Sequence, residues 1–129
     1  MKFNIRSFNA NDDTFLCAFE NSKFPDIFII TETWFRSDNI QEIDGYIGFH
    51  PCRGIGRSGG VSVYVSNSLV SRRIENLSFS NATIEICTVS VMVDESPLIL
   101  IAIYRPHSDC IQNFNDTFLE ILQDSEIYG

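Results

Sequence analysis

The sequence predicts a single α/β domain, and three patterns near its start support this prediction. Residues 2–6 alternate apolar and polar side chains, as a half-buried strand does. Residues 12–19 begin with two aspartates that can cap a helix, and they place three apolar side chains on one helical face. Residues 26–31 end in a short, β-branched apolar run that is typical of a strand covered on both faces. A strand, a helix and a second strand in this order indicate an α/β layer architecture.

The middle of the chain adds strands separated by a glycine-rich loop. Residues 46–50 fit a strand, and residues 51–60 hold four glycines, which favours a loop. Residues 61–65 then alternate cleanly and end at Asn67 and Ser68, two residues that favour a turn. We therefore expect two further strands in this region.

The last third of the chain predicts two long apolar strands and a helix. Between Ile84 and Val93 the apolar phase slips, which predicts either a bulge near Ile86 and Cys87 or two abutting strands. A turn over residues 94–97 leads into residues 98–104, whose apolar character is typical of a buried strand. Residues 109–122 match an amphipathic helix that starts with a capping-box pattern.

Composition limits the kind of protein this is. The chain has 129 residues, of which 44% are hydrophobic, enough for the core of one compact domain. No apolar run approaches the roughly 18–20 residues that a membrane span needs, and polar residues interrupt any signal-peptide core near the start. We therefore expect a nuclear or cytoplasmic protein with no membrane partner. The four cysteines are spread evenly, which favours reduced thiols over a zinc site, although an even count leaves disulfides open.

The charge distribution leaves two interpretations open. A net charge of −8 argues against a free-standing nucleic-acid binder, because phosphate contacts need Lys and Arg. However, the stretch from Gly45 to Ile74 contains no acid and four arginines, namely Arg53, Arg57, Arg72 and Arg73. These arginines either form a local basic face on an acidic body, or they are solvated and paired with acids elsewhere.

Glu32 is the first candidate for chemistry. It directly follows the apolar strand predicted over residues 26–31, in the sequence Thr31-Glu32-Thr33-Trp34. Burying an ionised carboxylate without a partner costs several kcal/mol, so Glu32 needs water, a cation or a donor. Ends of sheet strands are where α/β proteins place ligands, and the simpler alternative is an exposed acid at a strand end.

Four motifs in order carry a family resemblance. They are Asn4-Ile5-Arg6-Ser7, Thr31-Glu32-Thr33-Trp34, Gly59-Gly60-Val61-Ser62-Val63-Tyr64-Val65 and Tyr104-Arg105-Pro106. Together they resemble the N-terminal half of an endonuclease/exonuclease/phosphatase domain, most closely the endonuclease of non-LTR retrotransposon polyproteins, which precedes a reverse transcriptase. The resemblance implies that residues 1–129 form part of a deoxyribonuclease I-like α/β/β/α sandwich. Its two sheets are then mixed and mostly antiparallel, with helices outside.

The same resemblance implies roles for four residues. Glu32 is expected to be the principal ligand of Mg²⁺ or Mn²⁺, for which a carboxylate oxygen is suitable. Asn4 is expected to be a catalytic polar residue that closes the first strand, and Tyr104 to donate its hydroxyl to a phosphate oxygen. Arg105 is expected to add a charged contact to the phosphate. From the residues alone, Asn4 fits a strand or turn cap, and Tyr104 fits a core ring equally well.

The chain also departs from the family pattern. It contains neither the Gly-Asp-x-Asn nor the Ser-Asp-His motif that the family uses to activate water and assist proton transfer. Half a site is expected to be nearly inactive, because positioning and charge stabilisation supply most of the rate in phosphoryl chemistry. The parent domain is expected to nick DNA, with a C-terminal half or a reverse transcriptase domain as further partners.

Two alternatives to the nuclease remain open. One is a non-catalytic remnant or interaction module, and the other is a phosphatase of the same superfamily acting on inositol phosphates or other small phosphoesters. His50 and His107 lack an evident carboxylate partner in the sequence and receive no catalytic role. Because the chain is expected to supply mainly one sheet, the isolated polypeptide is expected to be poorly soluble or partly unfolded.

Overall fold

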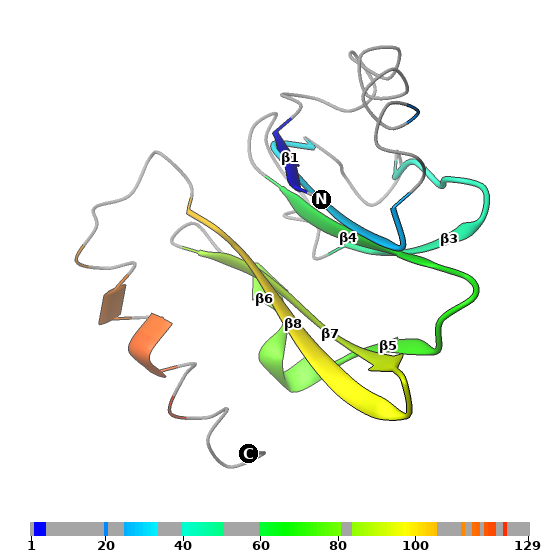
Figure 1. The fold of residues 1–129 in the computed structure, drawn as a ribbon. Coiled ribbons are helices and arrows are strands. Elements are labelled where there is room, and N and C mark those ends of the chain that lie inside the picture. Colours follow the sequence, from blue (N-terminus) through cyan, green and yellow to red (C-terminus); the bar gives the residue numbers. More distant parts are fainter. Residues whose placement is uncertain are drawn as a thin grey trace.

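The chain folds into two β-sheets that pack against each other (Figure 1). The computed structural model describes residues 2–4, 20, 25–33, 40–50, 60–80 and 84–105, together with seven positions between 112 and 123. Within these residues there are eight strands and one 3-10 helix, η1. No helix in the described part of the chain combines the length and the apolar character needed to cross a membrane.

The first sheet has the strand order β1-β2-β4-β3. It contains β1 (Lys2–Asn4), β2 (Ile27–Thr31), β4 (Val61–Ser66) and β3 (Tyr46–Phe49). β1 runs parallel to β2, whereas β4 is antiparallel to both β2 and β3. Consequently the last residues of β1 and β2 and the first residue of β4 lie at the same end of this sheet.

The second sheet is built around one long strand, β7 (Glu85–Val93). β8 (Ser96–Tyr104) pairs along its whole length on one edge. Two short strands, β5 (Ser71–Arg73) and β6 (Phe79–Ser80), pair with the opposite edge, and η1 (Glu75–Leu77) lies between them along the chain. The chain therefore contributes two sheets, and the expectation that it supplies mainly one is wrong.

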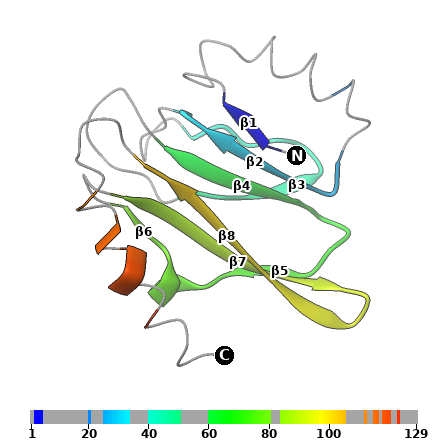
Figure 2. The same cartoon turned by 60° about the vertical axis from the view of Figure 1, so that its left-hand side comes forward.

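The core lies between the two sheets (Figure 2). It consists of alternate residues of the central strands and the end of β8, namely Val61, Val63, Val65, Cys87, Val89, Val91, Ala102 and Tyr104. Three of them, the valines of β4, share the phase that the sequence predicts for one face of this strand. Each fully buried valine contributes about 1.5–3 kcal/mol relative to an exposed one, so this contact is a major source of stability.

Aromatic rings cover the opposite face of the first sheet. The rings of Phe28 and Tyr64 stack with their centroids 4.9 Å apart, and Tyr46 packs edge-on against Phe28. The Tyr64 hydroxyl donates to the Gln41 carbonyl at 2.7 Å, which ties the segment before β3 to this face. β2 and β4 are thus covered on both sides, as the unbroken apolar run of β2 predicts.

β7 is continuous, so the predicted bulge near Ile86 and Cys87 is wrong. Its register with β8 is unbroken from Glu85–Tyr104 to Val93–Ser96. The apolar phase slips in the sequence because residues 85–89 are buried on both faces. The irregularity lies instead in the neighbouring edge, where residues 74–78 leave the sheet between β5 and β6.

Hydrogen bonds from Thr88 hold residues 74–78 in place. Its backbone carbonyl accepts from the Ile74 amide at 2.9 Å, and its own amide donates to Ser78 Oγ at 2.9 Å. The Thr88 hydroxyl donates to the Leu77 carbonyl at 2.6 Å. A threonine that is fully buried in the middle of β7 is therefore hydrogen-bonded through side chain and backbone.

β8 confirms the predicted strand but not its burial. Ala102 and Tyr104 are buried beneath the first sheet, whereas Leu98, Ile99 and Ile101 are 41–48% exposed. The rest of β8 stays exposed because β8 lies at the edge of its sheet and only its end packs under β4.

The predicted helices are described only in part. Residues 12–19 lie outside the described part of the chain, and so does the predicted first strand beyond Asn4. The seven described positions between 112 and 123 are all helical, and Gln112 Nε2 donates to Asp116 Oδ1 at 2.9 Å across one helical turn. Six of these positions lie within residues 109–122, so the predicted helix is confirmed there.

Candidate active site

Glu32 lies immediately after β2, as the sequence predicts, and it is buried with 6% of its surface exposed. Its backbone has a φ of 60°, which is uncommon for a residue other than glycine and ends the strand geometry. Its amide donates to the Gly60 carbonyl at 2.8 Å, so the ladder between β2 and β4 extends by one pair beyond Thr31 and Val61. The carboxylate is therefore attached to a fixed backbone.

Tyr104 meets Glu32 across the two sheets. It is the last residue of β8, is 9% exposed, and its hydroxyl donates to Glu32 Oε1. The structure therefore brings together two residues that are 72 positions apart in the chain. A hydroxyl donor satisfies one oxygen of the buried carboxylate, which would otherwise be costly to bury.

The two remaining predicted residues lie next to this pair. Asn4 ends β1 and pairs in register with Thr31, the residue before Glu32. Arg105 follows Tyr104 directly and is half-buried. Strand register thus places the backbones of Asn4 and Glu32 side by side, while chain connectivity places Arg105 beside Tyr104.

Glu85 belongs to the same region and escaped the sequence-based prediction. It is the first residue of β7, is fully buried, and pairs in register with Tyr104. Its Oε2 accepts from the Gly60 amide at 2.6 Å, and its Oε1 accepts from Ser80 Oγ at 3.2 Å. One sequence feature could have identified it, because Glu85 shares the phase of Cys87 and Val89, whose side chains form the core.

The described residues include a carboxylate at this end of the sheet but no cluster of metal-binding side chains. Among them, no group of three or more His, Cys, Asp or Glu side chains could hold a metal ion, so they contain no zinc-type cage. Mg²⁺ is commonly held by one or two carboxylates and keeps several waters. Glu32 is a carboxylate of this kind, and it lies at the end of a strand.

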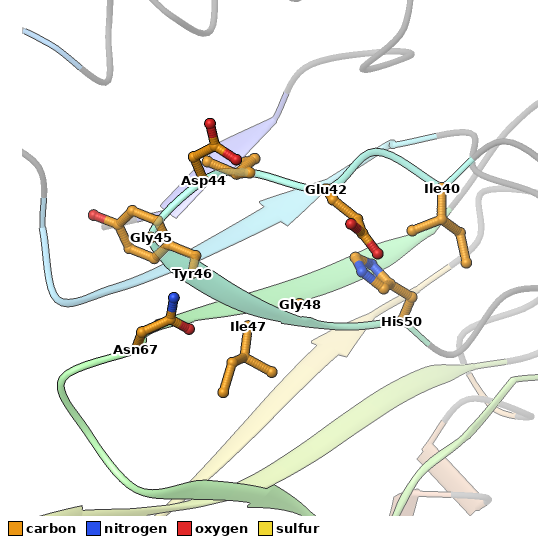
Figure 3. Close-up of a pocket in the computed structure, with 10 residues that line it drawn as sticks. Ile40, Glu42, Asp44, Gly45, Tyr46, Ile47, Gly48, His50 and Asn67 are labelled. Carbon is orange, nitrogen blue, oxygen red and sulfur yellow. The ribbon is translucent and has the colours of Figure 1, made fainter.

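An open pocket of about 750 Å³ lies beside β3 on the first sheet (Figure 3). Its acidic lining residues are Glu42 and Asp44, and none of the ten described lining residues is Lys or Arg. Neither Glu32 nor Tyr104 lines it. An acidic lining does not suit a phosphodiester, so we do not assign the substrate to this pocket.

His50, at the edge of this pocket, is held in the sheet by a hydrogen bond and by ring packing. Its Nδ1 lies 2.8 Å from Ser62 Oγ, and its ring packs edge-on against Tyr64. Burial, and secondarily the charge of Arg73, lowers the pKa of His50 to about 4. The neutral imidazole therefore fits the packing of the sheet.

Cys87 is a free thiol in the described part of the chain, as predicted for reduced cysteines. It is fully buried between the sheets, and burial raises its pKa to about 12. Such a thiol is a core residue and not a nucleophile. The other three cysteines lie outside the described residues.

Comparison with known proteins identifies the fold. No protein-family model matches the chain, and no curated protein matches it. Solved structures do match, among them the endonuclease domain of TRAS1, a telomere-specific non-LTR retrotransposon. That domain aligns with a TM-score of 0.67 and 16% identity over 95% of this chain and 51% of its own length.

A second protein gives the same result. D. rerio TDP2 complexed with single-strand DNA product aligns with a TM-score of 0.64 and 15% identity, over 97% of this chain and 53% of TDP2. A D. rerio TDP2 humanized by 14 mutations gives a TM-score of 0.65 at 15% identity, over 97% of this chain and 54% of the other. The chain has part of the endonuclease/exonuclease/phosphatase fold.

The predicted resemblance to the endonuclease/exonuclease/phosphatase superfamily is confirmed at the level of fold. The chain spans about half the length of each neighbour. Its strand pairs are mostly antiparallel, as predicted, but only the first sheet is mixed, because every described pair of the second sheet is antiparallel.

Proposed function

We propose that this chain is part of a divalent-metal-dependent DNA endonuclease domain that hydrolyses phosphodiester bonds, of the kind found in non-LTR retroelements. The observation that carries the proposal is the contact between Tyr104 and Glu32, which joins the two sheets at the end where β1 and β2 stop. The endonuclease domain of TRAS1, one of the structures with the same fold, gives it further support.

In this proposal Glu32 is the protein ligand of Mg²⁺ or Mn²⁺. When bound, the ion would neutralise the charge that develops on the scissile phosphate and stabilise the leaving oxygen. Glu32 suits this role because its backbone is fixed by Gly60 and its carboxylate has one oxygen held by Tyr104. A carboxylate that is already oriented loses little conformational entropy when it binds a ligand.

The neighbouring residues would act on the phosphate. The single hydroxyl proton of Tyr104, at the end of β8, is donated to Glu32 in this structure, and it would turn to a phosphate oxygen when Glu32 binds the metal. Arg105 adds a positive charge next to it, and a guanidinium can make two parallel hydrogen bonds to a phosphate. Asn4, which ends β1 beside Thr31, would supply an amide to the same end of the sheet.

We further propose that groups outside these 129 residues complete the site. The residues that would activate water and protonate the leaving group are not provided by a Gly-Asp-x-Asn or Ser-Asp-His motif in this chain. By this proposal helices cover the outer faces of the sheets, giving an α/β/β/α sandwich, and the 129 residues alone are nearly inactive on DNA.

Metal binding tests the proposal without requiring activity. We expect the chain to bind Mn²⁺, detected by electron paramagnetic resonance, and Glu32→Gln to weaken this binding by roughly tenfold or more, as loss of metal-site groups does. Glu42→Gln is the matched control, because Glu42 is an exposed acid in the pocket beside β3. Equal Mn²⁺ affinity in wild type and Glu32→Gln would contradict the proposal.

A plasmid-nicking assay with Mg²⁺ then addresses the reaction. Any cleavage by the chain should disappear in Glu32→Ala, and cleavage that persists unchanged removes Glu32 from the mechanism. A non-catalytic interaction module is the second candidate, and the exposed apolar residues of β8 favour it. Absence of Mn²⁺ binding, together with stability gained only in a complex, would support that alternative.

A further inference from the structure

We propose that Glu85 is a positioning residue of this site. Its buried carboxylate fixes the backbone of Gly60, and Gly60 in turn fixes the orientation of Glu32. This role rests on the proposed function, because Glu32 needs a defined orientation toward a metal only if it is a metal ligand. Glu85 itself is not proposed to touch the metal or the substrate.

The contacts form a closed ring that crosses between the sheets twice. Glu85 Oε2 accepts from the Gly60 amide at 2.6 Å, and the Gly60 carbonyl accepts from the Glu32 amide at 2.8 Å. Glu32 Oε1 accepts from the Tyr104 hydroxyl, and Tyr104 is the register partner of Glu85 in the second sheet. Each sheet thus sends one carboxylate to a donor on the other sheet.

The ring lies where the first sheet would otherwise fray. Glu32 and Gly60 form the pair beyond Thr31 and Val61, and both have positive φ, 60° and 105° respectively. The ends of strand ladders open most easily, because few contacts restrain them. The Gly60 amide donates to a carboxylate, and such charge-assisted bonds are shorter and stronger than neutral ones.

Stability alone does not require a carboxylate at position 85. Its side chain is fully buried in the phase of Cys87 and Val89, so an apolar residue would continue the core. Replacing buried charged groups with apolar ones of similar volume is often neutral or stabilising. A carboxylate adds a directional acceptor, and Ser80 fixes that direction by binding its second oxygen.

Three variants of the 129-residue chain test the role. Glu85→Gln is expected to lower Mn²⁺ affinity roughly tenfold, the usual size of an outer-shell effect. It should also move the Gly60 amide proton resonance upfield and speed its hydrogen exchange, because the acceptor loses its charge. Glu32→Gln should weaken Mn²⁺ binding by roughly tenfold or more while leaving the Gly60 amide resonance close to its wild-type position.

Thr88→Val is the matched control for a purely structural effect. It removes another fully buried polar group of β7, whose hydroxyl donates to the Leu77 carbonyl, away from Gly60. We expect a lower urea midpoint in this variant with unchanged Mn²⁺ affinity. If Glu85→Gln keeps wild-type affinity, or if affinity falls equally in Thr88→Val, the positioning role is overturned.

Two further outcomes are decisive. If Glu85→Gln does not fold, the wild-type Gly60 amide is the test: a slowly exchanging, low-field proton supports the role, and exchange at the rate of an unfolded chain overturns it. If the wild-type chain binds no Mn²⁺, the proposed function fails and the positioning role fails with it. Mn²⁺ binding that depends on Glu32 but not on Glu85 overturns the positioning role alone.

Discussion

Glu32 is a carboxylate in an environment that favours apolar side chains. Only 6% of its surface is exposed, and Thr33 beside it is 1% exposed. Burying a charged group costs several kcal/mol unless donors replace its water. The Tyr104 hydroxyl is one such donor, so it should contribute to the stability of this corner of the fold.

Removing that oxygen is the first prediction. Tyr104→Phe keeps the ring and deletes the hydroxyl, and we expect it to lower the free energy of unfolding by about 1–3 kcal/mol, the cost of a buried acceptor left without its donor. Urea unfolding measures the change. Tyr46→Phe is the control, because its hydroxyl bonds the Pro25 carbonyl at 2.6 Å in a more exposed position. A larger loss in the control would contradict the prediction.

His50 gives a prediction about pH. Burial and the charge of Arg73 lower its pKa from an ordinary 6.5 to about 4. The unfolded chain therefore binds a proton more readily than the folded one, and stability falls as pH drops from about 6.5 through 4. The expected loss below that window is about 3 kcal/mol for this group.

Nuclear magnetic resonance of the His50 ring measures this pKa directly. Little titration should occur between pH 7 and pH 5. Arg73→Gln should raise the pKa, because it removes the second of its two causes. A wild-type midpoint near 6.5 would show that the ring is hydrated and charged in the folded protein.

At the scale of elements, the hairpin of β7 and β8 has an unusual turn. Asp94 and Glu95 connect the strands between Val93 and Ser96, and both have positive φ, 49° and 67°. Two-residue hairpin turns of this kind favour Asn-Gly or Asp-Gly, because glycine adopts positive φ without steric cost. Glu95 is therefore a strained residue in a well-paired hairpin.

Relieving this strain should stabilise the chain. Glu95→Gly is expected to raise the free energy of unfolding by about 1 kcal/mol, since a non-glycine residue in the left-handed region costs about that much. Thermal and urea unfolding measure the gain. Glu95→Ala removes the charge but keeps the Cβ atom, so a gain as large in this variant would assign the effect to charge instead.

At the scale of the whole molecule, the second sheet leaves apolar surface uncovered. Met92, Val93, Leu98, Ile99 and Ile101 are 38–48% exposed. β8 pairs with β7 on one edge, and no described residue pairs with its other edge. An apolar edge strand is a template for association, and the neighbours of the same fold are about twice as long as this chain.

We therefore expect the isolated chain to self-associate and to be poorly soluble. Ile99→Lys should reduce association in sedimentation velocity, because it places a charge on the most exposed apolar residue of β8. Val70→Lys is the control, since Val70 is 74% exposed but precedes β5 on the opposite edge of the sheet. A monomer at all concentrations that melts cooperatively above about 90 °C would contradict this prediction.

Local patterns were sufficient for part of this structure. The apolar runs and turn residues gave β2, β4 and β8 to within about two residues, the usual uncertainty of helix and strand ends. They also placed Glu32 at a strand end, whereas Tyr104 entered only through the family resemblance, as a donor to a phosphate oxygen, and its contact with Glu32 was not predicted. These features depend on side-chain periodicity and on turn residues, which neighbouring positions in the chain carry.

The remaining features exist only because distant segments meet. β5, β6 and η1 are only two or three residues long. They are held in place by hydrogen bonds to β7, above all to Thr88. β7 is buried on both faces, so its periodicity carried no information about its register. Glu85 reaches Gly60 across 25 residues of chain and across two sheets. The sequence was therefore enough to locate an acid at the end of a strand. Which donors surround that acid was decided by the packing of the two sheets, because hydrogen bonds between sheets do not follow the periodicity of side chains along a strand.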